Sequence, residues 1–213
     1  MGRGHAAEDV CAQLDVSRET AERLQCYVDT LAKWQRKINL VSRTTLDEVW
    51  TRHILDCGQI HRLMPGPDGM IMDIGAGAGL PGLVLAIMRH GQYGDSASPV
   101  TLVESDQRKC AFLGVAARQC GVTIKIANER LERLPHLKPD VITARALASI
   151  EVLLNWTAAQ HHDGLKCVFL KGAQADEELT CLADYPNIKL MKTPSLTSPE
   201  GVVVELTGFM GSV

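Results

Sequence analysis

One stretch of the sequence, from Met70 to Gly82, constrains the fold more than any other. An apolar run ends at Asp73, a cluster of glycines follows, and a second apolar run begins at Leu83. This order predicts a strand, a tight turn and a helix, because glycine tolerates positive φ and lets a ligand approach bare backbone. The first N–H groups of the helix would face the turn, so the stretch indicates a site for a nucleotide-type ligand.

After this turn, short apolar runs alternate with amphipathic ones. We predict strands over residues 70–74, 100–104, 122–126, 139–143, 166–170, 187–192 and 201–207. We predict helices over residues 81–89, 107–119, 149–160 and 174–183. Such alternation is typical of an α/β fold with a mostly parallel sheet covered on both faces. The last two strands have no helix between them and suit a hairpin, which would place an antiparallel strand near the end of the sheet.

The first third of the chain has a different, helical pattern. We predict a short helix over residues 8–14 and an amphipathic helix that is capped by Ser17 and ends near Lys37. Thr45 is expected to cap a further helix, and the Pro- and Gly-rich run at residues 64–69 ends this region. We therefore expect a helical region over residues 1–66 that packs on an α/β domain over residues 67–213.

The net charge of -3 gives the chain no overall attraction to nucleic acid. Between Lys33 and Arg52, however, five basic residues stand against two acidic ones. Such a run is most often a solvated helix face, and it also suits a local patch that contacts phosphates.

No apolar run is long enough to span a membrane, and the first ten residues lack the apolar core of a signal peptide. The seven cysteines are odd in number and form no C-x-x-C pair, so we expect reduced thiols and a cytoplasmic protein. We expect no metal site and no membrane contact.

The glycine cluster can be aligned in two ways. Gly77-x-Gly79-x-x-Gly82 satisfies the dinucleotide pattern, but its first glycine lies too far beyond the strand. The alignment Asp73-x-Gly75-x-Gly77-x-Gly79 places an acid at the end of the strand, which would repel a pyrophosphate and suits a cationic ligand such as S-adenosylmethionine. Glu104, just after the second strand, is placed to accept hydrogen bonds from both ribose hydroxyls.

The fourth and fifth strands narrow the chemistry. Residues 141–146 lack the Asn/Asp-Pro-Pro-Tyr pattern of amino-group methylation. Cys167 lies inside an apolar strand and is interpreted as a core thiol, not as the nucleophile that pyrimidine C5-methylation requires. Arg145 and Lys171 remain as candidates for the catalytic site, because both stand at the carboxyl ends of strands, where open α/β sheets bind ligands.

Five segments resemble, in the same order, those of the RsmG family, also called GidB, the bacterial small-subunit ribosomal RNA guanine-N7 methyltransferases. They are Asn39–Ser42, Arg52–Asp56, Asp73–Gly82, Thr143–Ala146 and Leu170–Gly172. The similarity extends from about residue 24 to residue 206. It implies a class I Rossmann-like methyltransferase that uses S-adenosylmethionine, with 16S ribosomal RNA, the small subunit or an assembly intermediate as its partner.

The resemblance also implies roles for individual residues. Gly75 and Leu80 would line the S-adenosylmethionine pocket together with Asp73, Gly77, Gly79 and Glu104, and Leu131 and Glu132 would contact the adenine. Arg145 would stand at the face that cofactor and substrate share. Asn39, Arg52 and His53 are candidates for RNA contact, although a semi-buried packing role explains His53 equally well. The chain departs from the family at Cys57, where serine is usual, and at Glu104, where aspartate is common.

Methylation of guanine N7 releases no proton, so this function requires no general base. Arg145 and Lys171 would then position the guanine O6 or adjacent phosphates. Three alternatives remain open from the sequence: a small-molecule methyltransferase, a nicotinamide-dependent oxidoreductase and a non-catalytic nucleotide-binding module. We expect the protein to be a monomer.

Overall fold

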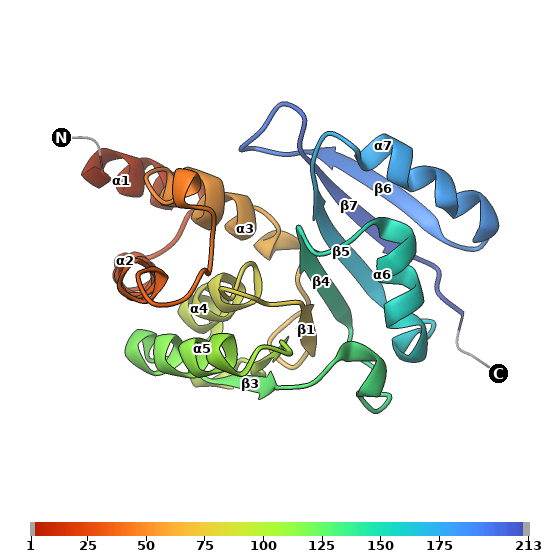
Figure 1. Cartoon of the computed structure of the whole chain (residues 1–213), viewed down its shortest axis with the longest axis horizontal. Coiled ribbons are helices and arrows are strands. Elements are labelled where there is room, and N and C mark those ends of the chain that lie inside the picture. The colour runs from red at the N-terminus through yellow and green to blue at the C-terminus, as the bar shows by residue number, and fades with distance from the viewer. Residues whose placement is uncertain (1–2, 211–213) are drawn as a thin grey trace.

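A seven-stranded sheet forms the centre of the molecule (Figure 1). The computed structural model describes residues 3–210 and has the strand order β3-β2-β1-β4-β5-β7-β6. The strands are β1 (Ile71–Ile74), β2 (Val100–Val103), β3 (Ile124–Ala127), β4 (Val141–Arg145), β5 (Lys166–Lys171), β6 (Lys189–Pro194) and β7 (Val202–Thr207). Strands β1 to β5 are parallel, and β7 runs antiparallel to both β5 and β6. The predicted α/β fold and its terminal hairpin are confirmed.

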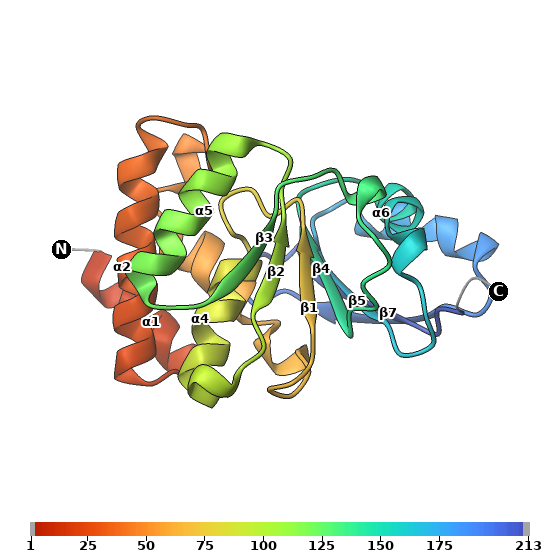
Figure 2. The same ribbon diagram turned by 90° about the horizontal axis from the view of Figure 1, so that it is seen from below.

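Helices cover both faces of the sheet, as Figure 2 shows. They are α1 (Arg3–Gln13), α2 (Arg18–Gln35), α3 (Asp56–Gly58), α4 (Gly82–Tyr93), α5 (Gln107–Cys120), α6 (Ile150–Thr157) and α7 (Ala175–Glu178). Helices α4 and α5 lie on one face with α1 and α2 outside them, and α6 and α7 lie on the other face. Every residue of β1 and β2 is buried, which explains why these strands are apolar runs without alternation.

Short 3-10 and π turns connect these elements. They are η1 (Arg43–Thr45), η2 (Trp50–Leu55, a π-helix), η3 (His61–Leu63), η4 (Gly94–Ser96), η5 (Leu131–Arg133), η6 (Ala158–Gln160) and η7 (Leu179–Asp184). Two predicted helix boundaries are corrected by the structure. The helix predicted over residues 81–89 extends to Tyr93 as α4, and the helix predicted over residues 174–183 is a short α-helix followed by a 3-10 turn.

The N-terminal helices are tied to the sheet through one continuous apolar cluster. Residues of α2 such as Leu24 and Leu31 are fully buried in the same cluster as Leu83 of α4 and Phe112 of α5. Ser17 caps α2 as predicted, accepting a hydrogen bond from the Thr20 N–H at 3.2 Å. The division of the chain into a helical region and an α/β domain near residue 66 stays a prediction. The apolar cluster continues across that boundary.

Thr45 does not cap a helix, so that prediction is wrong. Its hydroxyl donates to the Ser42 carbonyl at 2.9 Å, and the following helical segment, η2, begins only at Trp50. The reason is a competing partner, since the same hydroxyl also bonds the His53 ring at 2.9 Å. Among residues 3–210, no helix combines the length and the apolar character that crossing a membrane requires.

Candidate functional site

The glycine turn follows β1 as the sequence predicts. Gly75, Gly77 and Gly79 all have positive φ, at 64°, 54° and 84°. The Leu80–Pro81 peptide bond is cis, and α4 begins at Gly82. Gly75 is required for a further reason, because a Cβ there would lie 2.4 Å from a methyl carbon of Leu147.

Asp73 holds this turn from behind and does not line a cavity. Its side chain is fully buried; one oxygen accepts from the Gly82 N–H at 2.9 Å and the other from the Thr143 hydroxyl at 2.8 Å. Burial raises the pKa of the carboxyl to about 7, against the two hydrogen bonds, which lower it. The structure therefore corrects the expected contact between Asp73 and a ligand: the acid fixes the start of α4 instead.

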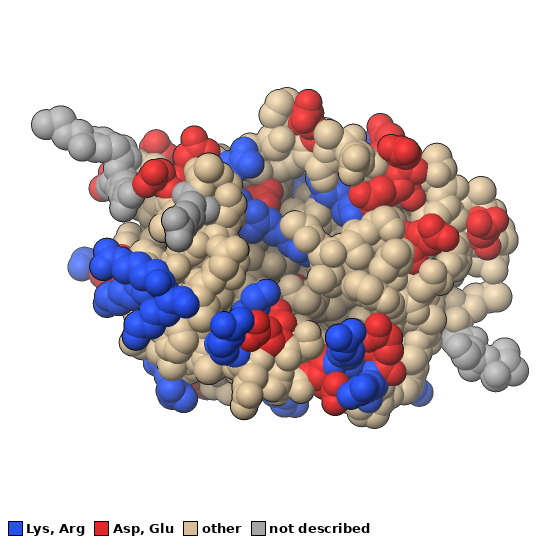
Figure 3. Space-filling view, viewed as in Figure 1, with Lys and Arg blue, Asp and Glu red and all other residues tan. Residues whose placement is uncertain are grey.

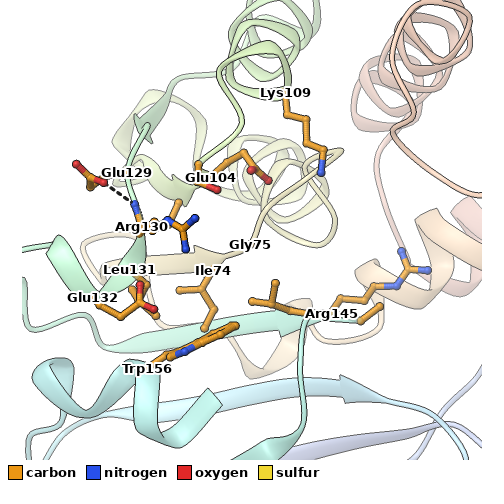
Figure 4. Close-up of a pocket in the computed structure, with 14 residues that line it drawn as sticks. Ile74, Gly75, Glu104, Lys109, Glu129, Arg130, Leu131, Glu132, Arg145 and Trp156 are labelled. Carbon is orange, nitrogen blue, oxygen red and sulfur yellow. Dashed lines mark hydrogen bonds between the residues drawn. The ribbon is translucent and has the colours of Figure 1, made fainter. Parts of the chain in front are cut away.

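Glu104 occupies the predicted position at the end of β2. One carboxylate oxygen accepts from the Gly77 N–H at 2.9 Å and the other from the Asp106 N–H at 2.8 Å. These bonds leave further lone pairs on both oxygens, and the side chain lines the cavity described next (Figure 4). A carboxylate held by two backbone donors is a rigid acceptor.

A cavity of about 350 Å³ opens at the carboxyl ends of β1, β2 and β4 (Figure 4). This is where the strand order reverses direction, the usual ligand position in open α/β sheets. It is lined by Ile74, Gly75, Val103, Glu104, Ser105, Lys109, Glu129, Arg130, Leu131, Glu132, Arg145, Ala146, Leu147 and Trp156.

Five of the predicted cofactor-binding residues line this cavity: Gly75, Glu104, Leu131, Glu132 and Arg145. Gly77, Gly79 and Leu80 do not line the cavity and belong to the glycine turn that follows β1. The other nine lining residues were not predicted as site residues, among them Lys109, Arg130, Leu147 and Trp156. Lys109 is recognisable only as a helix residue shortly after β2, and nothing in the sequence around Trp156 distinguishes it from a core residue of α6.

A wider groove of about 1080 Å³ adjoins the cavity and shares Arg145, Ala146 and Leu147 with it. Its walls come from the ends of β4 and β5, from Arg52 and Asp56, and from the loop between β6 and β7. Figure 3 shows this part of the surface as a hollow with basic side chains inside it. A small cavity beside a larger groove suits a small ligand and a larger partner.

The Arg145 guanidinium is almost fully engaged within the protein. Its Nε pairs with Asp56 at 3.0 Å, and its Nη2 donates to the Arg52 carbonyl and to His53 Nδ1, both at 2.9 Å. Nη1 contacts the Cys57 sulfur at 3.6 Å. Since a guanidinium has five N–H groups, at most one remains for a ligand. The structure thus brings three predicted residues, Arg145, Arg52 and His53, together.

His53 links Arg145 to the loop before it. Burial and the neighbouring Arg145 charge lower the pKa of His53 to about 4, so the imidazole is neutral at pH 7. Nδ1 accepts from Arg145, which leaves Nε2 as the donor to the Thr45 hydroxyl at 2.9 Å. The ring is therefore a fixed connector with both nitrogens in use.

Lys171 is similarly occupied. Its Nζ lies 2.5 Å from Glu178 and donates to the Ala148 carbonyl at 2.7 Å. Glu178 in turn accepts from the Ile150 N–H at 3.0 Å, at the start of α6. Lys171 thus holds the segment of residues 146–149 at Ala148, while Arg145 ties the end of β4, just before this segment, to residues 52–57.

Of the three cations that line the groove, Arg52, Arg145 and Lys171, Arg52 is the one that remains available to a ligand. Its side chain is exposed and lines the groove, and it forms no ion pair with another residue among those that the structure describes. Asn39 lies elsewhere, exposed in a shallow depression at the end of α2 with Arg36 and Lys37. Basic side chains also gather over that part of the surface in Figure 3. Within residues 3–210, no cluster of three or more His, Cys, Asp or Glu side chains is arranged to hold a metal ion.

Comparison with known proteins identifies the family. Its relatives include the ribosomal RNA small subunit methyltransferase G of Paramagnetospirillum magneticum, which is 45% identical over 93% of this chain and 94% of its own. That of Rhodospirillum rubrum is 43% identical over 93% and 96%. The family profile described as rRNA small subunit methyltransferase G matches residues 20–201. The chain belongs to this family. The predicted family and its class, a methyltransferase of small-subunit ribosomal RNA, are confirmed.

Solved structures of lower identity share the fold with this methyltransferase G family member. A ribosomal protein L11 methylase from Lactobacillus delbrueckii has a TM-score of 0.57 at 18% identity, covering 74% of this chain and 78% of its own. A TehB-like SAM-dependent methyltransferase from Corynebacterium glutamicum has a TM-score of 0.56 at 16% identity, covering 84% and 98%. The Rossmann-like methyltransferase fold is confirmed.

One further contact of the family member was not visible in the sequence. The Tyr27 hydroxyl of α2, fully buried, donates to the Ala78 carbonyl in the glycine turn at 2.8 Å. The N-terminal helices therefore support the glycine turn directly, and burial raises the pKa of this tyrosine well above its usual value. Cys167 is fully buried within β5, which confirms its interpretation as a core thiol.

Proposed function

We propose that this protein transfers the methyl group of S-adenosylmethionine to N7 of a guanine in small-subunit ribosomal RNA. The observation that carries the proposal is the cavity at the ends of β1, β2 and β4, which opens into a groove lined by Arg52. The family to which the chain belongs gives the RNA class, and the predicted resemblance gives the guanine and its N7.

The residues of the cavity fit S-adenosylmethionine. Glu104 offers carboxylate lone pairs to a ribose diol, and Leu131 and Val103 offer apolar surface to a base. Gly75 lines the cavity with backbone alone, beside the Leu147 side chain that fills the place of a Cβ. The cavity is lined by three carboxylates, of Glu104, Glu129 and Glu132, and by three cations, of Lys109, Arg130 and Arg145. Both signs of charge suit a ligand that carries an ammonium, a sulfonium and a carboxylate. When bound, the ligand supplies an electrophilic methyl group.

The residues around the groove do not need to move a proton. N7 uses its lone pair to form the new bond to carbon, the sulfonium takes the electrons of the broken bond, and the guanine becomes cationic. The protein must align N7 and exclude water from it. Lys171 serves this by holding Ala148, and Arg145 serves it by anchoring the end of β4, while Arg52 is free to contact a phosphate or the guanine O6.

Recognition of the RNA is confined to one face in this proposal. Its basic groups are Arg52 in the groove and, at the end of α2, the exposed Lys33, Arg36 and Lys37 with Asn39 beside them. Figure 3 shows basic side chains both inside a hollow and gathered at one side of the same face. A protein of net charge -3 then binds RNA through local contacts, so its affinity falls with salt. We expect the protein to work in the cytoplasm, as a monomer, on the small subunit or its precursor.

Two measurements test this function against its alternatives. S-adenosylhomocysteine at a hundred times its Kd is expected to stabilise the protein by about 2.7 kcal/mol, and NAD is expected to have no effect. Labelled S-adenosylmethionine is then supplied with small-subunit particles, their naked RNA or free guanosine. Label in RNA supports the proposal; label only in small molecules, or stabilisation by NAD alone, refutes it.

A further inference from the structure

Leu147 stands where the cavity and the groove meet. Only three residues line both spaces, namely Arg145, Ala146 and Leu147. Of these, Leu147 has the only large apolar side chain, and it is 36% exposed. A group that passes from one space to the other must pass beside this side chain.

The position of Leu147 is fixed from several sides. Its two methyl carbons lie 2.4 and 2.6 Å from where a Cβ of Gly75 would be, so the side chain rests directly on the Gly75 backbone. Ala146 has a φ of 48°, which turns the chain sharply before Leu147. Lys171 holds the next residue through the Ala148 carbonyl at 2.7 Å. Leu147 is therefore a preformed surface.

Leu147 is the exposed large apolar side chain of this groove. Six large hydrophobic side chains of the described residues are exposed, and Leu147 is the only one of them that lines the groove. Leu170 and Val202 also line it, and the charged groups around Leu147 include two ion pairs, Arg145 with Asp56 and Lys171 with Glu178. An exposed apolar side chain beside charged groups matches an RNA base that has left its stack, since such a base needs apolar contact on its face.

We infer that Leu147 is the residue against which the face of the acceptor guanine packs, so that its N7 edge is directed at the cavity. The inference rests on the proposed function and adds a positioning residue to it. The apolar contact holds the base at the junction, and Arg52 at the groove wall holds its phosphate. The role requires a large apolar side chain and no hydrogen-bonding group.

The test compares Leu147→Asn, which keeps the approximate shape and removes the apolar surface, with Leu147→Met, which restores it. Loss of one apolar contact in a binding pocket is worth roughly 10- to 200-fold in specificity. We expect kcat/KM for RNA to fall at least ten-fold in Leu147→Asn and to recover to within three-fold in Leu147→Met. Leu190→Asn, at an exposed leucine on the edge strand β6, is the matched control and is expected to retain wild-type kinetics.

A second readout does not depend on turnover. RNA with 2-aminopurine beside the target guanine becomes brighter when that guanine leaves the stack, and this increase is expected to be smaller with Leu147→Asn. Leu147 also lines the cavity, so stabilisation by S-adenosylhomocysteine is measured too and is expected to fall by less than kcat/KM for RNA does. Wild-type RNA kinetics in Leu147→Asn would overturn the inference, as would a loss of S-adenosylhomocysteine binding that accounts for the whole defect. Failure of the wild-type enzyme on every RNA would instead refute the proposed function, and the inference with it.

Discussion

Arg145 links the N-terminal helical region to the end of β4, and its replacement by methionine is the most informative perturbation of that link. Arg145→Met keeps a similar volume and leaves the Asp56 carboxylate without its partner at 3.0 Å. The two side chains are only 18% and 17% exposed. Breaking a buried ion pair costs about 3–5 kcal/mol, and the remaining exposure places this pair near 3 kcal/mol.

The assay is urea unfolding followed by tryptophan fluorescence, with the free energy of unfolding obtained by linear extrapolation. Adding Asp56→Asn to Arg145→Met is expected to recover part of the loss, with a coupling energy of about 1–3 kcal/mol in the double-mutant cycle. Arg118→Met, on the exposed face of α5, serves as the control. An Arg145→Met midpoint equal to that of the wild type, or a coupling energy of zero, would refute the assignment of Arg145 as the connector.

Three other substitutions test separate parts of the site. Tyr27→Phe leaves the buried Ala78 carbonyl without its donor and is expected to lower the free energy of unfolding by about 1–2 kcal/mol, with weaker S-adenosylhomocysteine binding by calorimetry. Asp73 has its pKa raised from 3.8 to about 7 on folding, so its contribution to stability is complete below about pH 4 and is lost as the pH rises towards 7. In Asp73→Asn the free energy of unfolding should fall less steeply between pH 4 and 8 than in the wild type. The same dependence on pH in both proteins would contradict this prediction. Arg52→Ala should raise KM for RNA and reduce the salt slope by about 1, whereas Arg118→Ala should change neither.

Features that depend on neighbours in the sequence were predicted well. The turn from Asp73 to Gly82 and the cap at Ser17 are local, because their donors and acceptors lie within ten residues of one another. The sheet followed from its apolar runs, since buried parallel strands are recognisable by composition alone. Element ends were less accurate where 3-10 turns extend helices, as after Glu178.

Features that depend on distant partners could not be predicted. Arg145 reads from the sequence as a free strand-end cation, and its role changes only once Asp56 and His53 are seen beside it. Asp73 was expected to meet a ligand, but Thr143 of the adjacent strand takes one of its oxygens. Tyr27 gives no local signal at all. In each case the deciding contact joins residues that lie more than fifty positions apart.

The atom that receives the methyl group is the most direct test of the proposed transfer to guanine N7. RNA from small-subunit particles that have been incubated with the protein and S-adenosylmethionine is treated with borohydride and aniline, which cleave the chain at N7-methylguanosine. We expect cleavage at one guanine, dependent on the protein and reduced by Leu147→Asn. Methylated RNA that resists cleavage, or a methyl group found on another atom of the base by mass spectrometry, would contradict it.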